Sequence, residues 1–178
     1  MEIIVDGYNF IGRQKGLRGY LEEKRRRLID QLSSYRTIKG FPITVVFDGE
    51  GRGGAERSGG VEVVFSGYGE SADDVIIRMA EALREGCTVV SSDRAVQDQV
   101  RSHGGVAVFS GEFEARLHSA LSPNSSIGAA GPSGPTHLAP LEDKDDSSEP
   151  LSQPGPKKGN PRRLSKAERR RQGRLKQL

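Results

Sequence analysis

The chain is poor in the residues on which several classes of site depend. Its 178 residues include one cysteine, three histidines and no tryptophan. Cys87 has no partner for an intrachain disulfide, which fits a reducing compartment, so we expect a cytoplasmic protein. His103 and His118 lie far from any Cys-His spacing, so a zinc site is not expected. No apolar run is long enough to span a membrane, and the first residues lack a signal-peptide pattern.

Two phosphate-handling motifs are also absent. The glycine-rich stretch 49–60 is not followed by Gly-Lys-Ser/Thr, so it is not a phosphate-cradling loop. The first apolar run lacks the Asp-x-Asp of a phospho-aspartate enzyme, which argues against a small-molecule phosphohydrolase. We interpret residues 49–60 as a flexible loop that carries Arg52 and Arg57 near a functional crevice, where they can meet substrate phosphates.

Charge divides the chain into three parts. Residues 1–121 have a net charge of −2, and residues 122–156, rich in Pro, Ser and Gly, have −4. Residues 157–178 carry ten basic side chains and one acid, a net charge of +9. We predict a folded domain over 1–121, a disordered linker over 122–156 and a basic tail over 157–178. Such a tail favours a polyanion partner, most often nucleic acid, and its alternative is a role in solubility alone.

The folded part alternates short β-branched apolar runs with amphipathic stretches. The pattern predicts strands at 1–5, 43–47, 61–65, 88–91 and 106–109, and helices at 20–35, 71–85, 94–103 and 112–121. This order predicts an α/β domain of three layers with a mainly parallel, five-stranded central sheet. The tail is expected to be disordered on its own, and its removal is expected to leave the fold intact.

Carboxylates follow three of the predicted strands and are the most informative feature of the chain. Asp6, Asp48 and Asp93 come directly after apolar runs, and Asp73-Asp74 opens a predicted helix. The carboxyl ends of parallel strands line one crevice, where ligands bind. Clustered acids repel one another unless a cation neutralises them, and hard oxygen ligands suit Mg²⁺ or Mn²⁺. The pattern therefore predicts a metal-assisted hydrolase.

Several of these acids also have a structural explanation. Ser71 with Asp74 has the spacing of a capping box, so we favour Asp73 as the site residue and Asp74 as at least partly a cap. Asp93 has good N-cap chemistry for the helix that follows it. Asp98, further along that helix, is either an additional metal ligand or part of a solvated helix face.

Four segments together resemble a known family: Val5-Asp6-Gly7-Tyr8-Asn9, Val46-Phe47-Asp48-Gly49, Ser71-Ala72-Asp73-Asp74 and Val90-Ser91-Ser92-Asp93. Over residues 1–121 the chain is similar to the YacP-like branch of the NYN-domain proteins, within the PIN-like nuclease superfamily. The resemblance implies a PIN-like fold and a metal-dependent endoribonuclease, with mRNA on ribosomes as a suggested target. It implies these site residues: Asp6, Asn9, Asp73 or Asp74, Asp93 and, more weakly, Asp98.

We therefore predict a metal-dependent endoribonuclease that uses Mg²⁺ or Mn²⁺, with RNA and the ribosome as partners. The rival hypothesis is a non-catalytic RNA- or ribosome-binding adaptor, which would have little use for clustered acids facing RNA. Because the acidic site cannot attract RNA unaided, basic side chains must supply the attraction. The candidates are Arg13, Lys15, Arg18, Arg52, Arg57, Lys157, Lys158, Arg169, Arg170 and Arg171.

Overall fold

The computed structural model describes residues 1–13, 21–49, 52–122 and 164–178. The elements, in chain order, are β1 (Glu2–Asp6), α1 (Gly7–Arg13), α2 (Leu21–Lys39), β2 (Ile43–Phe47), β3 (Arg52–Ser58), β4 (Val61–Gly67), α3 (Ala72–Leu83), a 3₁₀ turn (Arg84–Gly86), β5 (Cys87–Val90), α4 (Arg94–Ser102), β6 (Val106–Val108), α5 (Ser110–Leu121) and α6 (Lys166–Gln177).

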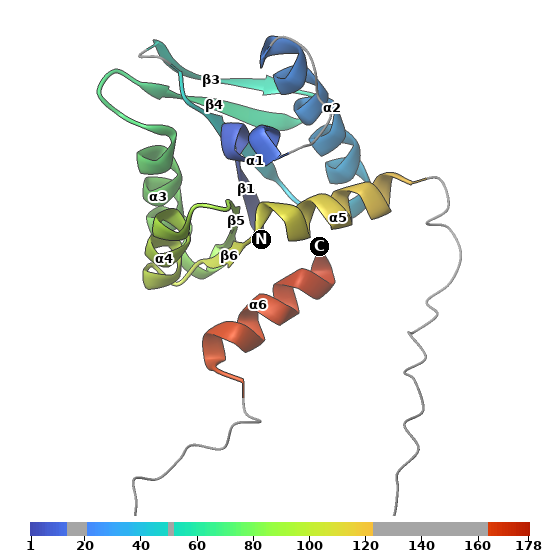
Figure 1. The fold of residues 1–178 in the computed structure, drawn as a ribbon, viewed down its shortest axis with the longest axis vertical. Helices are drawn as coiled ribbons and strands as arrows, with labels where there is room; N and C mark the ends of the chain where they lie inside the picture. The colour runs from blue at the N-terminus through green and yellow to red at the C-terminus, as the bar shows by residue number, and fades with distance from the viewer. Residues whose placement is uncertain (14–20, 50–51, 123–163) are drawn as a thin grey trace, which may run out of the picture.

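The sheet has the strand order β3-β4-β2-β1-β5-β6 (Figure 1). β3 runs antiparallel to β4, and every other neighbouring pair is parallel. This confirms the predicted α/β class and mainly parallel sheet. The described sheet has six strands, so the expected number of five is wrong, and the additional strand is β3.

The sequence pattern does not reveal β3 because its side chains are polar or small and do not alternate with apolar ones. It lies in the stretch that we interpreted as a flexible loop. A two-residue turn at Gly59 and Gly60 joins it to β4, and both glycines have positive φ, 56° and 81°. This backbone matches the twist of a hairpin and suits glycine. A polar strand is tolerated here because β3 is at the edge of the sheet.

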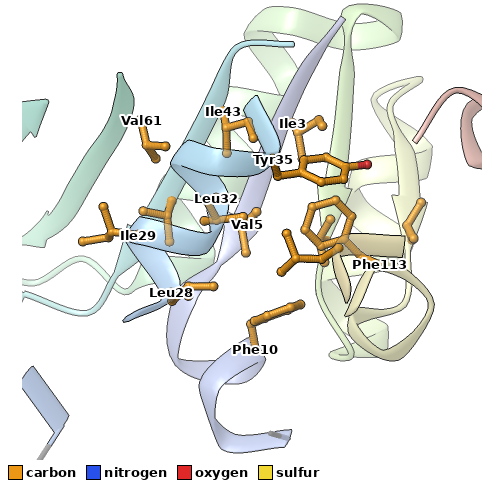
Figure 2. Packing of buried hydrophobic residues seen from close by; sticks show 14 of the residues in the cluster. Ile3, Val5, Phe10, Leu28, Ile29, Leu32, Tyr35, Ile43, Val61 and Phe113 are labelled. Atoms are coloured by element: carbon orange, nitrogen blue, oxygen red, sulfur yellow. The ribbon is translucent and has the colours of Figure 1, made fainter. Parts of the chain in front are cut away.

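Helices cover both faces of the sheet, and the core is divided accordingly. Along β1, Ile3 and Val5 join the cluster under α1, α2 and α5, whereas Ile4 joins the cluster under α3 and α4. Successive residues of a strand point to opposite faces, which explains the division. Figure 2 shows the first cluster, in which α2 packs Leu32 and Tyr35 against the strands and Phe113 of α5.

α6 packs against β6 and α5, although the sequence predicts that the tail would be disordered on its own. Leu178 is only 4% exposed and belongs to the core cluster of Ile3 and Tyr35. The Tyr35 hydroxyl donates a hydrogen bond to the Leu178 carbonyl, and burial raises the pKa of Tyr35 to about 12. The fold therefore includes part of the predicted tail.

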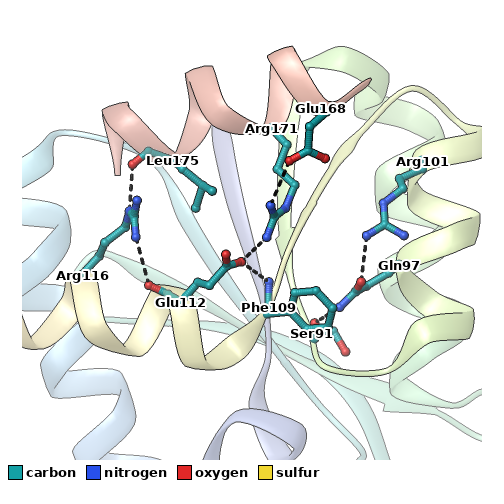
Figure 3. A network of polar contacts seen from close by, with 9 residues as sticks. All are labelled: Ser91, Gln97, Arg101, Phe109, Glu112, Arg116, Glu168, Arg171 and Leu175. Atoms are coloured by element: carbon teal, nitrogen blue, oxygen red, sulfur yellow. Dashed lines mark hydrogen bonds and ion pairs between the residues drawn. The ribbon is translucent and has the colours of Figure 1, made fainter. Parts of the chain in front are cut away.

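Polar contacts fix α6 along its length (Figure 3). Arg171 pairs with Glu112 of α5, and Arg116 of α5 donates from Nε to the Leu175 carbonyl at 2.8 Å. Arg170 pairs with Glu85, which lies just after α3. The N-terminus of the helix begins at Ser165, whose hydroxyl accepts from the Glu168 amide at 3.1 Å.

The predicted linker, 122–156, lies outside the described residues except for Ser122, so its boundaries stay a prediction. Among the helices that the structure describes, none combines the length and the apolar character needed to cross a bilayer.

Candidate active site

The candidate site lies at the carboxyl edge of the parallel strands. β2, β1 and β5 are neighbours in the sheet, so Asp6, which ends β1, lies along the same edge as Asp48 and Asp93, which come after β2 and β5. The start of α3 supplies Asp73 to the same group, because the charges of Asp48 and Asp93 both act on it. The strand-end acids therefore form one electrostatic cluster, as a crevice of parallel strands predicts.

Asp6 is the most buried of these carboxylates, with 6% of its surface exposed. Its Oδ2 accepts from the Ser91 hydroxyl at 2.8 Å, and its Oδ1 accepts from the Asn9 amide at 3.3 Å. Burial raises the pKa of Asp6, and the charges of Asp73 and Asp93 raise it further, while the two hydrogen bonds oppose the shift. A cation beside Asp6 would offset this cost of ionisation.

Asp73 and Asp74 are adjacent but have different environments. Burial is the main cause that raises the pKa of Asp73, and the negative charges of Asp93, Asp74 and Asp48 raise it further. Asp74 is exposed and forms a complete capping box with Ser71, whose hydroxyl and amide donate to Asp74 Oδ2 at 2.7 and 2.9 Å. The Ser71 hydrogen bonds lower the pKa of Asp74. The geometry thus gives Asp74 the structural role and leaves Asp73 for the site.

The structure confirms the N-cap role of Asp93 and places its charge near the other acids. It is the N-cap of α4, and its Oδ1 accepts from the amides of Ala95 at 2.7 Å and Val96 at 3.3 Å. Its charge also acts on Asp6 and Asp73. Asp98 is exposed and pairs with Arg101 at 2.8 Å, and it is not among the charges that act on Asp6 or Asp73.

Asn9 and Ser91 connect the loops that carry the acids. Asn9 Oδ1 accepts from the Ser92 amide at 3.0 Å and from the Ser110 hydroxyl at 3.3 Å. Ser91 Oγ donates to Asp6 and accepts from the Asp93 amide at 3.1 Å. Asn9 therefore links α1 to the loop after β5 and to the start of α5, and Ser91 bridges Asp6 and the backbone of Asp93.

The sequence is only a weak signal for the role of Ser91, and it does not reveal two other supporting residues. Gln97 is buried and donates from Nε2 to the Ser91 carbonyl at 2.7 Å (Figure 3). Ser66, also buried, donates to Asp48 at 3.2 Å and accepts from the Gly49 amide at 3.1 Å. A glutamine between Val96 and Val100 is a weak signal in a sequence, because its partner is 6 residues away in a loop.

Asp6 and Asp48 are each followed by a glycine because a side chain at that position would clash with its neighbours. A Cβ on Gly7 would lie 2.2 Å from the buried ring of Phe47, and one on Gly49 would lie 2.5 Å from the Ser66 carbonyl. Both contacts are far inside van der Waals distance, so α1 and the chain after β2 can approach the sheet only with glycine there. The repeated Asp-Gly pattern thus follows from close packing under the acids.

The predicted RNA-binding residues divide by position. Lys15, Arg18, Lys157 and Lys158 lie outside the described residues. Arg13 ends α1, and Arg52 begins β3 opposite Gly67, at the edge of the acids. Arg57 lies opposite Glu62, at the amino end of β4, so the expectation that it lies near the crevice is wrong.

The remaining candidates are in α6. Arg169 is exposed, whereas Arg170 and Arg171 pair with glutamates of the domain. Two of these three cations are therefore partly neutralised by contacts within the chain.

The donor set of the cluster consists of carboxylate oxygens, which suit Mg²⁺ or Mn²⁺. Within the part of the chain that the structure describes, no three His, Cys, Asp or Glu side chains form a ready set of direct ligands. Mg²⁺ keeps several waters and usually binds through one or two carboxylates. An ion at this edge would therefore have to be held partly through water.

Comparisons with known proteins identify relatives of this domain. The family model for the YacP-like NYN domain matches residues 3–130. The uncharacterized protein YacP of Bacillus subtilis (strain 168) is 33% identical over 114 residues, which span 58% of this chain and 67% of YacP. Crystal structures of Rae1 (YacP) from B. subtilis align with a TM-score of 0.58. The W164L mutant is 29% identical, covering 67% of this chain and 76% of that one. The structure without that substitution is 27% identical, covering 67% and 75%.

Proposed function

The chain belongs to the YacP-like NYN domain family, whose NYN domains are PIN-like and generally nucleases, and on this basis we propose that it is a metal-dependent endoribonuclease. The reaction is hydrolysis of phosphodiester bonds in RNA. The observation that carries the proposal is the position of buried Asp6 at the carboxyl edge of the sheet, where the Ser91 hydroxyl bridges it to the backbone of Asp93. Burial of a carboxylate beside other acids disfavours its ionised form, and acids in such surroundings are concentrated at functional sites.

Asp6, Asp73 and Asp93 would hold one or two Mg²⁺ or Mn²⁺ ions, partly through water. When bound, such an ion lowers the pKa of a coordinated water and neutralises charge that develops on the phosphate. Asp74 borders the site as a cap and modulates Asp73 through its charge. We assign Asp98 to the solvated face of α4 because it pairs with Arg101.

Ser91 and Asn9 act as positioning residues in this proposal. The Ser91 hydroxyl donates to Asp6 Oδ2 and holds it in one orientation. The backbone amide of Asn9 donates to Asp6 Oδ1, and the side-chain oxygen of Asn9 accepts from the Ser92 amide. Both residues therefore keep the acids of two strands in a fixed relation. Pre-organised ligands lose less conformational freedom when an ion or a phosphate binds.

RNA is the proposed partner, and mRNA on the ribosome is its proposed context. The acids repel a polyanion, so cations at the same edge must attract it. Arg52 begins β3 at that edge, opposite Gly67 at the carboxyl end of β4, which supports it as the first candidate, and Arg13 at the end of α1 is a further candidate.

The test is incubation of the full chain with total RNA and with ribosome-bound mRNA, in Mg²⁺, Mn²⁺ or EDTA, followed by mapping of new RNA ends. New ends are expected with either metal and not with EDTA. Asp6→Asn should abolish them, because it keeps the shape of the side chain and removes one negative ligand. Asp30→Asn on the exposed side of α2 is the matched control and should cleave as the wild type does.

The alternative adaptor function makes the opposite prediction. An adaptor binds RNA or ribosomes in all three buffers, produces no new ends and is insensitive to Asp6→Asn. Metal-independent binding with no cleavage would therefore replace the nuclease proposal with the adaptor.

A further inference from the structure

A groove of about 340 Å³ lies beside the acids, on the α1–α2 side of the sheet. Its walls include Tyr8, Leu21, Arg25, Asp48 and Phe65. Two links connect it to the proposed site. Tyr8 is two residues after Asp6, and Asp48, which forms one wall, acts by charge on Asp73. The groove therefore opens at the same edge of the sheet as the carboxylates.

Tyr8, Phe65 and Arg25 line this groove, and each of them packs against the ring of Phe47, which is itself buried beneath them. Arg25 Cζ lies 5.8 Å from the ring centroid of Tyr8 and 5.2 Å from the centroids of both Phe47 and Phe65. The Tyr8 and Phe47 centroids are 5.1 Å apart, and those of Phe47 and Phe65 are 6.0 Å apart. These distances are typical of aromatic and cation–π contacts.

Hydrogen bonds hold the guanidinium group in place. Arg25 donates from Nη2 to the Tyr8 hydroxyl at 2.7 Å, and its Nη1 pairs with Glu22 at 3.1 Å. The Arg25 side chain is 21% exposed, and its buried Nε has no hydrogen-bond partner among the described residues. A buried donor without a partner costs stability, so core packing alone does not account for an arginine here.

We propose that this groove binds one unpaired nucleobase of single-stranded RNA, next to the phosphodiester that the acids receive. The proposal rests on the nuclease function and names its substrate class. Planar aromatic and guanidinium groups are the partners on which unpaired bases stack. A base within a duplex is already paired and stacked, so the groove selects single strands.

The test is a double-mutant cycle between the bases and Tyr8, measured by equilibrium binding in EDTA so that no cleavage occurs. The ligands are a short single-stranded oligoribonucleotide and the same ribose-phosphate chain without bases. Tyr8→Leu should weaken binding of the strand with bases by about 5- to 150-fold, the range of a base–aromatic stack. It should leave the affinity of the abasic strand unchanged, because the phosphates remain.

Two further variants separate stacking from folding and from charge. Tyr8→Phe keeps the ring and should keep the difference between the two strands. Arg25→Lys keeps the charge and removes the planar group, so it should reduce that difference, whereas Arg26→Lys on the exposed side of α2 should not. Thermal unfolding of each variant identifies any loss of fold, and only variants that remain folded at the assay temperature enter the cycle.

An equal loss of affinity for both strands in Tyr8→Leu, or no loss for either, would overturn the nucleobase site. These outcomes are distinct from failure of the nuclease proposal. RNA cleavage by the wild type without base–Tyr8 coupling would leave the nuclease and reject the groove. Coupling without metal-dependent cleavage would leave the groove and reject the nuclease.

Discussion

Leu178 provides the sharpest test of the way in which α6 is built into the domain. Its side chain is 4% exposed and packs in the cluster of Ile3 and Tyr35. Truncation of a buried leucine to alanine costs about 2–5 kcal/mol. For Leu178→Ala we expect the free energy of unfolding to fall by about 2–3 kcal/mol, the lower part of this range. The loss cannot exceed the free energy with which α6 binds to the rest of the domain, because α6 can detach as a unit. The ion pairs of α6 are partly exposed and contribute about 0.2–1 kcal/mol each.

The assay is thermal unfolding of the full chain followed by circular dichroism, with chemical denaturation as a second measure. For a chain of this size a loss of 1 kcal/mol lowers Tm by roughly 2–4 °C, so Leu178→Ala should lower it by roughly 4–12 °C. Leu164→Ala is the matched control, because Leu164 is 45% exposed and precedes the helix. A change at such a surface position is usually within about 0.5 kcal/mol.

Removal of residues 164–178 should lower Tm at least as much as Leu178→Ala does. If Leu178→Ala and Leu164→Ala unfold at the wild-type temperature, the packing of α6 against the core is wrong. The original expectation, that the tail can be removed without effect on the fold, would then stand.

Two further predictions concern the acids. Asp93→Asn should lose RNA cleavage but change the free energy of unfolding by less than about 0.5 kcal/mol, because asparagine is as good an N-cap as aspartate; a large loss of stability would assign Asp93 a mainly structural role. In metal-free buffer the pKa values of Asp6 and Asp73 are raised above 3.8, so the folded state binds more protons than the unfolded state over the range above 3.8. The free energy of unfolding should therefore fall as pH rises through the folded-state pKa values, and Asp6→Asn should reduce this slope. Mg²⁺ should raise Tm at neutral pH more in the wild type than in Asp6→Asn, and an equal rise in both proteins would argue against Asp6 as a ligand.

The central strands were predictable because the pattern of apolar residues along each segment determines whether it forms a buried strand. Ile43–Phe47 is buried at every position, as its continuous apolar run predicts, and Val61–Gly67 alternates more, as a strand beside the edge does. α1 was not predictable in the same way. It begins at Gly7, directly after Asp6, so no loop signal separates strand from helix.

The acids of the site were predictable from their places at strand ends, but their relations were not. The spacing of Ser71 and Asp74 predicted the capping box and so favoured Asp73 over Asp74 for the site, and the Ser71 hydrogen bonds confirm the cap. The support of Asp6 by Ser91 joins residues 85 positions apart. Periodicity and capping rules describe neighbours along the chain, so they have no access to such a contact.

The tail shows why net charge alone does not identify a partner. Once Lys166–Gln177 is a helix, its periodicity places its cations on different sides. Arg170 and Arg171 face glutamates of the domain, and Arg174 donates to the Glu85 carbonyl at 2.6 Å. Arg169 and Lys176 are exposed. Cations that are paired within the chain release fewer counterions on binding RNA, so the exposed ones should dominate any salt-dependent affinity of α6. The composition of the tail predicts a positive segment, and its packing decides how much of that charge RNA can meet.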